Sequence, residues 1–289
     1  MTGLEGRASR LRSLHGDGPV LVLPNAWDAA SAVVIEEAGA AAIATTSAGV
    51  AWALGFPDGE QLTRDVMLGA VSRIAAAVAV PVTADVEAGY GPEPTDVAAT
   101  VEATLAAGAV GINLEDSSGP AELFGRDAQS ERIRAARDAA TAAAVPSFVI
   151  NARTDVFLRE IGDAGGRLDD VLARAAAYAE AGADCLFVPG LLDLAVLESL
   201  ASSAPLPVSA MARPGGPTIT ELAATGVRRI SVGPAISEAA YGLARRAARE
   251  LLEDGTYESL AGAISFPELQ SLLSPGRATP GGSESFAGG

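Results

Sequence analysis

Prolines and glycines recur at regular intervals at the boundaries of apolar runs, and this pattern constrains the fold more than any other feature. Prolines open short apolar runs at intervals of about 60 residues, at Pro19, Pro81, Pro146 and Pro207. Between them, glycines end alanine-rich stretches and lead into further apolar runs, at Gly39, Gly108, Gly182 and Gly226. Because helices commonly end at a glycine, the second set also locates helix ends. Together the two sets predict eight β-strands.

Helical patterns fill the intervals between the predicted strands. The clearest cover residues 63–78, 94–108, 130–143 and 167–182. Strands that are apolar throughout, without the polar alternation of a half-exposed sheet, are typical of parallel sheets covered by helices. We therefore predict an α/β fold of the (β/α)8 TIM-barrel type over residues 1–255. An open doubly wound sheet is the alternative, but eight evenly spaced units favour closure.

Two segments follow the eighth predicted strand. The first is a long helix over about 236–254, and residues 256–273 then carry a further helical pattern with an apolar face. That surplus apolar face predicts contacts between subunits, and hence a homodimer or homotetramer. Residues 274–289 are rich in Gly, Ser and Pro, a composition that cannot bury a core, so we expect a disordered tail.

The chain is strongly acidic, with a formal net charge of -16 and a pI of about 4.4. Nucleic acids and anionic membrane surfaces are bound by basic faces, so we expect neither as a partner. No stretch approaches the ~20 apolar residues of a membrane span, and the first residues lack the apolar core of a secretory signal. Together with the single cysteine, Cys185, these features predict a cytoplasmic protein.

All 20 basic residues are arginines, because the sequence contains no lysine. Schiff-base aldolases, pyridoxal enzymes and P-loop proteins depend on a lysine amine, so these classes are excluded. The one histidine, His15, precedes the first strand and is expected to be exposed to solvent. A single histidine argues against serine-histidine triads and against clusters of histidine ligands.

Carboxylates gather where the third and fourth predicted strands end. Asp85 and Glu87 stand in "TADVEAGYG", and Glu115 ends the run "GINLE". The carboxyl ends of the strands carry the active site of a TIM barrel, so these acids would meet at its mouth. Oxygen ligands without histidine or cysteine favour a hard cation, Mg²⁺ with Mn²⁺ as the second choice. For Glu87 and Glu115, the alternative is that they cap loops or pair with arginines.

Arginines and a turn of small residues complete the predicted mouth. Arg153, in "INARTD", offers a planar fork that suits a substrate carboxylate, and an ion pair with Asp155 or Asp85 is the alternative. Arg213, at the end of the seventh strand, either grips a second carboxylate or forms a surface ion pair. Hydroxyls and backbone amides after the second strand form a candidate substrate-binding nest, made by Thr46, Ser47 and Gly49.

Five segments, taken in chain order, resemble the isocitrate lyase/phosphoenolpyruvate mutase superfamily. They are "LPNAWDAASA", "TTSAGVAWALGFPDGE", "PVTADVEAGYG", "GINLEDS" and "INARTD". The resemblance spans roughly residues 18–255. It implies a (β/α)8 barrel whose last helix packs onto a neighbouring subunit, and a site that binds Mg²⁺ together with a 2-oxo acid or its enolate.

The resemblance also assigns roles to individual residues. The metal and its waters would be held by Asp58, Asp85, Glu87 and Glu115. The carboxylate or oxo group of the ligand would contact Ser47, Ala48 and Gly49. Arg153 would clamp a carboxylate, and it would carry catalysis together with Asp58 and Asp85. Tyr90 or a metal-bound water is the candidate proton donor, and simple packing in the "GYG" turn is the alternative for Tyr90.

One segment departs from this family. Its lyases carry a Lys-Lys-Cys-Gly-His type loop after the fourth strand, and its phosphoenolpyruvate mutases and phosphonopyruvate hydrolases carry a lysine there. The corresponding residues 117–133 contain no lysine, cysteine or histidine. We therefore expect a Mg²⁺-dependent lyase or decarboxylase that acts on a small 2-oxo or 2-hydroxy di- or tricarboxylate, such as oxaloacetate, through an enolpyruvate-type intermediate. A phosphorus-carbon bond enzyme and a catalytically silent barrel that binds a 2-oxo acid stay open as alternatives.

Overall fold

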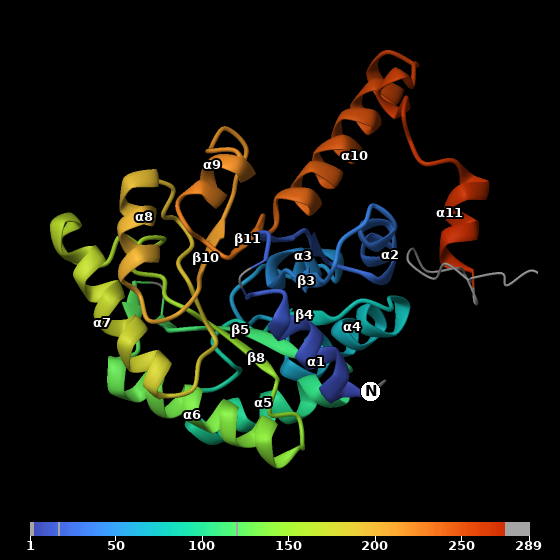
Figure 1. The fold of residues 1–289 in the computed structure, drawn as a ribbon. Coiled ribbons are helices and arrows are strands. Elements are labelled where there is room, and N and C mark those ends of the chain that lie inside the picture. The colour runs from blue at the N-terminus through green and yellow to red at the C-terminus, as the bar shows by residue number, and fades with distance from the viewer. Residues whose placement is uncertain (1–2, 17, 120, 275–289) are drawn as a thin grey trace, which may run out of the picture.

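A parallel sheet of nine short strands forms the centre of the chain in the computed structural model, which describes residues 3–16, 18–119 and 121–274 (Figure 1). In spatial order the strands are β1 (Leu21–Leu23), β11 (Arg229–Ser231), β10 (Val208–Met211), β9 (Cys185–Phe187), β8 (Val149–Arg153), β5 (Gly111–Glu115), β4 (Val82–Asp85), β3 (Ile43–Thr45) and β2 (Asn25–Ala26). Pro24 alone separates β1, which pairs with β11, from β2, which pairs with β3. The sheet thus returns on itself through a divided first strand, and the predicted eight-stranded barrel is confirmed.

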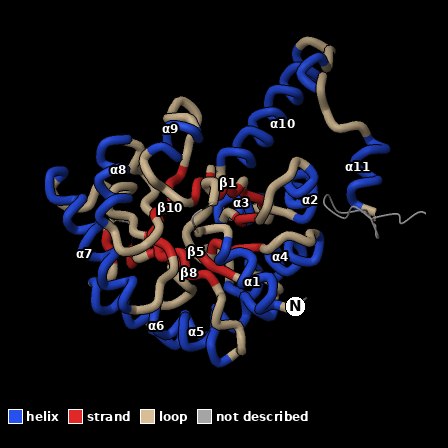
Figure 2. The backbone as a smooth tube through the Cα atoms, viewed as in Figure 1, coloured by secondary structure: helices blue, strands red, loops and turns tan. Residues whose placement is uncertain are grey.

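Helices surround the strands (Figure 2). Those that connect successive strands are α2 (Ala29–Glu37), α4 (Arg64–Ala77), α5 (Pro94–Ala106), α6 (Arg126–Ala142), α7 (Arg167–Glu180), α8 (Leu194–Ser203) and α9 (Ile219–Ala224). Helix α1 (Leu4–Ser13) precedes β1, and the short α3 (Ser47–Ala53) follows β3 directly. A small antiparallel hairpin, β6 (Ser117–Gly119) with β7 (Glu122–Leu123), lies between β5 and α6.

The four predicted helix-ending glycines all adopt the left-handed backbone region. Their φ angles are 98° at Gly39, 91° at Gly108, 98° at Gly182 and 90° at Gly226. They follow α2, α5, α7 and α9, and each N–H donates to a carbonyl of the preceding turn, at 2.9 to 3.1 Å. A side chain with a Cβ rarely adopts this conformation, which explains why glycine stands at these four helix ends.

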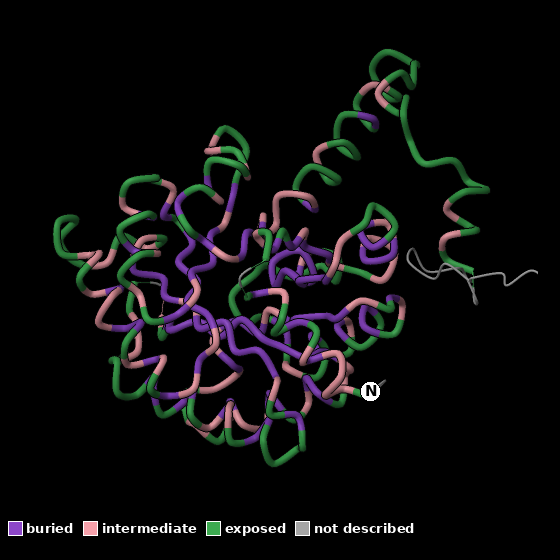
Figure 3. Tube along the Cα trace, in the orientation of Figure 1, coloured by how far each residue is buried: buried purple, intermediate pink, exposed green. Residues whose placement is uncertain are grey.

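Burial follows the strands and the inner faces of the helices (Figure 3). Helix α4, for example, buries Met67, Val71 and Ile74 on one face, a spacing of three or four residues. Cys185, the first residue of β9, is fully buried, as expected for a small core residue, and burial raises the pKa of its thiol to about 12. No helix in the described parts of the chain is long and apolar enough to cross a membrane.

The C-terminal segment extends away from the barrel. Helix α10 (Ala235–Glu253) points outward, and α11 (Phe266–Leu273) lies beyond it and contacts α2 (Figure 1). Apolar side chains on this segment are exposed, notably Leu252 (86%) and Phe266 (77%), and Val22 in β1 is 39% exposed. Between the two helices, the 3-10 turn Glu258–Leu260 is the helical structure found within 256–265. A swap onto a neighbouring subunit stays a prediction, and residues 275–289 of the predicted tail lie outside the described residues.

His15 does not lie in solvent as the sequence suggested. Its side chain is only 7% exposed, because helix α1 turns its C-terminal end against the bottom of the barrel. The ring Nδ1 lies 2.8 Å from the carbonyl oxygen of Leu11. Burial, together with the positive charge of Arg229, lowers the pKa of His15 from 6.5 to about 4. The folded chain therefore holds this imidazole neutral at neutral pH.

This buried histidine predicts a pH dependence of stability. A folded-state pKa below the unfolded value means that the unfolded chain takes up the proton first, so stability falls as the pH drops from about 7 toward 4. Between pH 7.5 and pH 5 we expect a loss of about 2 kcal/mol in the free energy of unfolding from this residue. Urea denaturation at both pH values, compared between the natural chain and His15→Gln, measures it. An equal pH response in the two proteins would contradict the prediction.

Candidate active site

The predicted acids and Arg153 lie at the carboxyl end of the barrel because they end adjacent parallel strands. Asp85 is the last residue of β4, Glu115 of β5 and Arg153 of β8. Glu115 and Arg153 are direct partners in the register of β5 and β8. Glu87 follows two residues after β4 with a φ of 51°, and its carbonyl oxygen accepts a hydrogen bond from Glu115 N–H at 2.9 Å. The structure therefore brings these four side chains together.

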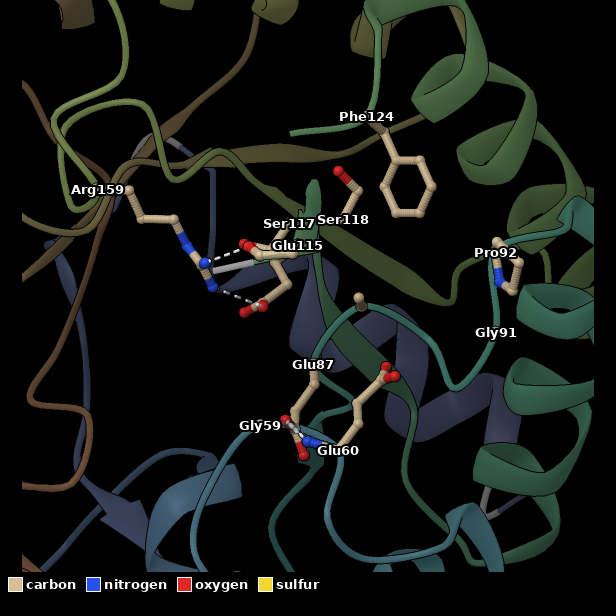
Figure 4. Close-up of a pocket in the computed structure, with 12 residues that line it drawn as sticks. Gly59, Glu60, Glu87, Gly91, Pro92, Glu115, Ser117, Ser118, Phe124 and Arg159 are labelled. Carbon is tan, nitrogen blue, oxygen red and sulfur yellow. Dashed lines mark hydrogen bonds and ion pairs between the residues drawn. The ribbon is translucent and has the colours of Figure 1, made fainter. Parts of the chain in front are cut away.

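The predicted residues line two neighbouring cavities among the described residues. The smaller, of about 220 Å³, is lined among others by Asp58, Asp85 and Arg153, with Thr46 and Ser47 beside them. The larger, of about 400 Å³, is lined by Glu87 and Glu115, by Arg159 and by the β6–β7 hairpin with Phe124 (Figure 4). In the close-up, Arg159 points toward Glu115, and Glu87 lies against the backbone of Glu60. We call the first the mouth cavity and the second the hairpin cavity.

Arg153 is held between two carboxylates. Its Nε and Nη2 donate to Asp155 at 2.6 and 3.0 Å, and its Nη1 lies 2.8 Å from Glu115 Oε2. The ion pair with Asp155 that the sequence left open is therefore present. Although burial opposes it, the charges of Glu115 and Asp155 raise the pKa of Arg153. The guanidinium is rigid, permanently charged and still lines the mouth cavity.

Three acids at the strand ends, Asp85, Glu87 and Glu115, have raised pKa values. Burial, with the charge of Asp58 adding to it, raises the pKa of Asp85 against the opposing charge of Arg153. Burial and the charges of Asp58 and Asp85 raise the pKa of Glu87 to about 8. Burial likewise raises the pKa of Glu115. Carboxylates crowded into one poorly hydrated place repel each other unless a cation offsets their charge.

The donor chemistry of this cluster fits a hard divalent cation bound largely through water. Among the residues that the structure describes, no three or more His, Cys, Asp or Glu side chains stand close enough to hold a metal ion directly. Mg²⁺ usually keeps several waters and takes one or two carboxylates, so a complete protein cage is not required. Asp85 and Asp58 in the mouth cavity, with Glu87 and Glu115 nearby, are oxygen donors of the required kind.

Ser47 orients Asp85 from the first turn of α3. Its backbone N–H and its hydroxyl lie 3.4 and 3.3 Å from Asp85 Oδ2. Thr46 caps the same helix, and Ala48 and Gly49 continue its buried first turn. A Cβ on Gly49 would stand 2.9 Å from Trp27 Cβ, which explains the glycine. The substrate-binding role of this turn stays a prediction.

Two predicted residues have less favourable positions. Tyr90 donates a long hydrogen bond of 3.5 Å to Glu87 Oε1, and burial together with that carboxylate raises the pKa of its phenol, which makes proton donation harder. Arg213 is exposed after β10 and does not line the mouth cavity. Its roles in binding a second carboxylate or pairing on the surface stay untested.

The loop that carries Glu87 is held in place by a buried arginine. Arg132 on α6 donates to the carbonyl oxygens of Gly91 at 2.7 Å and Pro92 at 2.6 Å, and also to that of Ala88. Its guanidinium also lies 4.2 Å from the ring centre of Phe124. One side chain thus fixes both the Glu87 loop and the wall of the hairpin cavity.

Sequence reasoning missed three polar contributors to the site. Glu60 donates its N–H to Glu87 at 2.5 Å, and Arg159 pairs with Asp155 at 3.0 Å. Asn113 lines the mouth cavity two residues before Glu115. The two-residue period of a strand could have identified Asn113, because it shares a face with Glu115. No comparable signal marks Glu60, whose contact depends on the fold of its loop.

The family description "Phosphoenolpyruvate phosphomutase" matches residues 11–252 of the chain. The chain belongs to this family, and through it to the isocitrate lyase/phosphoenolpyruvate mutase superfamily, as the five motifs indicated. The match covers the whole barrel and most of α10. It confirms the family, whose members catalyse more than one reaction.

Three relatives illustrate the range of that family. The chain is 34% identical over 229 residues to 2-methylisocitrate lyase of Escherichia coli, covering 76% of this chain and 71% of the lyase. It is 33% identical over 227 residues to oxaloacetate decarboxylase 2 of Pseudomonas fluorescens, covering 75% and 73%. A phosphonopyruvate hydrolase solved with oxalate and Mg²⁺ superposes with a TM-score of 0.80 at 25% identity, covering 92% of this chain and 94% of the other.

Proposed function

We propose that this protein is a Mg²⁺-dependent carbon-carbon lyase of the decarboxylase kind, acting on a small 2-oxo dicarboxylate such as oxaloacetate. The observation that carries the proposal is the mouth cavity, whose lining includes Asp58, Asp85 and Arg153 and, among the described residues, no lysine, cysteine or histidine. Loss of carbon dioxide needs no base, so this set of residues suffices. Similarity to an oxaloacetate decarboxylase supports the assignment.

The roles follow from the positions of the side chains. Arg153 binds the carboxylate next to the oxo group, and its pairs with Asp155 and Glu115 keep the guanidinium fixed. The first turn of α3, with Ser47 at its start, orients Asp85 and closes one side of the cavity. Asp85 and Asp58, with Glu87 and Glu115 behind them, would hold the cation and its waters. When bound, Mg²⁺ would supply positive charge to offset the charge that develops on the substrate's 2-oxygen.

The bond that breaks lies between the third carbon and the distal carboxylate of the substrate. Its electron pair moves into the 2-oxo group, carbon dioxide leaves, and the resulting enolate of pyruvate takes up one proton to give pyruvate. The small size of the mouth cavity, about 220 Å³, suits a substrate of this length. Because Tyr90 is a poor acid here, we assign the final proton to water rather than to a side chain.

Proton and phosphorus NMR with a substrate panel tests the reaction class. The purified protein with Mg²⁺ is incubated with oxaloacetate, 2-methylisocitrate, isocitrate and phosphonopyruvate, and with EDTA in a matched sample. We expect pyruvate from oxaloacetate, at a rate above that of Mg²⁺ alone, and loss of that excess rate when EDTA removes the metal. Unchanged turnover in EDTA would refute the metal requirement.

Two other outcomes of the same substrate panel would each favour one of the two alternative functions. Phosphate released from phosphonopyruvate would favour the phosphorus-carbon alternative, which the likeness to a phosphonopyruvate hydrolase motivates. Oxalate binding without turnover of any member would favour a silent barrel that binds 2-oxo acids. The missing proton-transfer residues in the β6–β7 hairpin motivate that second alternative.

We also propose that the protein works as a homodimer or homotetramer in the cytoplasm. Helix α10 projects from the barrel, and its end carries exposed leucines, while the barrel strand β1 leaves Val22 partly exposed. A second copy would cover both surfaces. The domain division at residue 255 is part of this proposal, with 256–273 as the oligomer contact.

Disruption of the exposed end of α10, which leads into this segment, should change the size of the particle. We expect Leu252→Glu to convert the oligomer to a monomer, because the charge would have to be buried against the second copy. Light scattering after size-exclusion chromatography gives the mass. The control is Glu253→Gln, a change at the neighbouring exposed residue, which should leave the mass unchanged. An equal mass for both variants and the natural chain would contradict the contact.

A further inference from the structure

An asparagine of the mouth cavity has no part in the chemistry described so far. Asn113 stands in β5 and is only 5% exposed. In the sheet it is the register partner of Asp85 on one side and of Asn151 on the other. The same cavity is lined by Asp85 and Arg153. Its side chain is therefore placed to contact a ligand bound in that cavity, either through Oδ1 or through Nδ2.

The oxygen end of this amide faces the barrel interior. Asn113 Oδ1 accepts hydrogen bonds from Asn151 Nδ2 at 2.8 Å and from Arg229 Nη2 at 3.0 Å. A guanidinium has five N–H donors and no acceptor, so only the oxygen of the amide can face Arg229. Ser209 Oγ supports the arrangement, because it donates to Asn151 Oδ1 at 2.9 Å and leaves the Asn151 amide nitrogen for Asn113.

The nitrogen end is consequently directed to the mouth cavity. Within the described residues, Nδ2 of Asn113 has no hydrogen-bond acceptor. The atom is not among the buried polar atoms that lack a partner, so it is accessible from the cavity. We propose that Asn113 Nδ2 donates a hydrogen bond to an anionic carboxylate or enolate oxygen of the bound 2-oxo acid, and that Arg229 is the positioning residue that fixes the amide in this orientation. The inference rests on the proposed function and adds a substrate contact to it.

The position of Arg229 is otherwise costly. Its side chain is 1% exposed, it makes no ion pair within the described residues, and its Nη1 has no partner there. Burial lowers the pKa of this arginine to about 10. A buried charge without a counter-ion destabilises a fold. Beneath the cavity, this charge contributes one useful constraint, since it allows only the donor end of Asn113 to face the ligand.

Oxalate binding in the presence of Mg²⁺, measured by calorimetry on the full chain, tests the contact. Asn113→Leu has the shape of the amide without its polar atoms, and Asn113→Asp keeps an acceptor for Arg229 but loses the donor. We expect Asn113→Leu to bind oxalate about 10- to 100-fold more weakly, the effect of losing a hydrogen bond to a charged group. Asn113→Asp should bind at least as weakly, with a thermal midpoint at or above that of the natural chain.

The outcomes separate this inference from the function beneath it. If the natural chain binds oxalate and folded Asn113→Leu binds it within about twofold, the inference is overturned and the proposed function stands. If the natural chain does not bind oxalate with Mg²⁺, the proposed function fails and the inference with it. Should Asn113→Leu not fold, Asn113→Asp decides, because unchanged affinity overturns the contact and a loss of tenfold or more supports it.

A double-mutant comparison tests Arg229 as a positioning residue. We expect Arg229→Met to weaken oxalate binding in the natural background and to add nothing in the Asn113→Leu background, since no amide is left to orient. Arg229→Lys keeps the charge and a donor and should restore part of the affinity. An equal loss from Arg229→Met in both backgrounds would show a general structural effect and overturn the assignment.

Discussion

Asp85→Ala is expected to lower kcat/KM for the proposed 2-oxo acid substrate by at least about 10³-fold at saturating Mg²⁺, because it removes an acid to which we assign a role in holding the cation. Asp85 is the acid that Ser47 orients with two donors and that shares the cavity with Arg153. Pyruvate formation, followed by NMR or by a coupled assay, measures the loss. Residual activity above about one tenth of the natural value would remove Asp85 from its assigned role.

Although Asp85→Ala should lose activity, we expect its free energy of unfolding to be unchanged or higher. The pKa of Asp85 is raised by burial, so this group contributes stability when protonated at low pH and loses it as the pH rises through its folded pKa. At pH 8 we therefore expect Asp85→Ala to unfold at or above the denaturant midpoint of the natural chain. Asp138→Ala, on the exposed face of α6, is the matched control and should leave activity unchanged. Lost activity with lost stability in Asp85→Ala would indicate misfolding.

Arg132→Met is expected to lower the free energy of unfolding by about 3 kcal/mol or more. The arginine is fully buried and satisfies the carbonyl oxygens of Ala88, Gly91 and Pro92 in one loop. Methionine fills much of the volume but donates nothing, so these carbonyl groups lose their partner. Because Glu87 belongs to the same loop, weaker Mg²⁺ binding should accompany the loss of stability. Urea denaturation and Mg²⁺ titration measure the two effects.

A matched control lies two residues along the same helix. Arg134 is exposed on α6, so Arg134→Met makes the same substitution at an exposed position. Surface substitutions of this kind stay within about 0.5 kcal/mol. Equal effects of the two substitutions would show that the loop does not depend on Arg132.

The fold was accessible from the sequence where a local signal decides the structure. Gly39 and Gly108 end helices because of their own backbone conformation, so a single residue carries the information. The divided first strand was not accessible in the same way, since β1 and β2 are defined by their partners, β11 and β3. His15 was misjudged for a related reason. Its burial depends on how α1 lies against the barrel, which no pattern around residue 15 records.

The residues of the candidate site also divide into those that a local sequence signal identifies and those that only the folded chain brings together. Asp85, Glu115 and Arg153 were identifiable because each ends a strand, and the ends of parallel strands meet. Asp58, on an exposed loop, came from the family resemblance alone. Whether Arg153 would choose Asp155 or Asp85 depended on side-chain geometry. The orientation of Asn113 depends on an arginine 116 residues away, a relation that only the folded chain reveals.

The outward course of α10 has a consequence for how the barrel responds to dilution. The pairing of β1 with β11 closes the sheet, and Val22 on β1 is 39% exposed. Helix α10 follows β11 and points away from the barrel (Figure 1). If a second copy covers this seam, mass action couples closure of the barrel to association. The melting temperature should then rise with protein concentration, and the seam should exchange its amide hydrogens fastest in the most dilute samples.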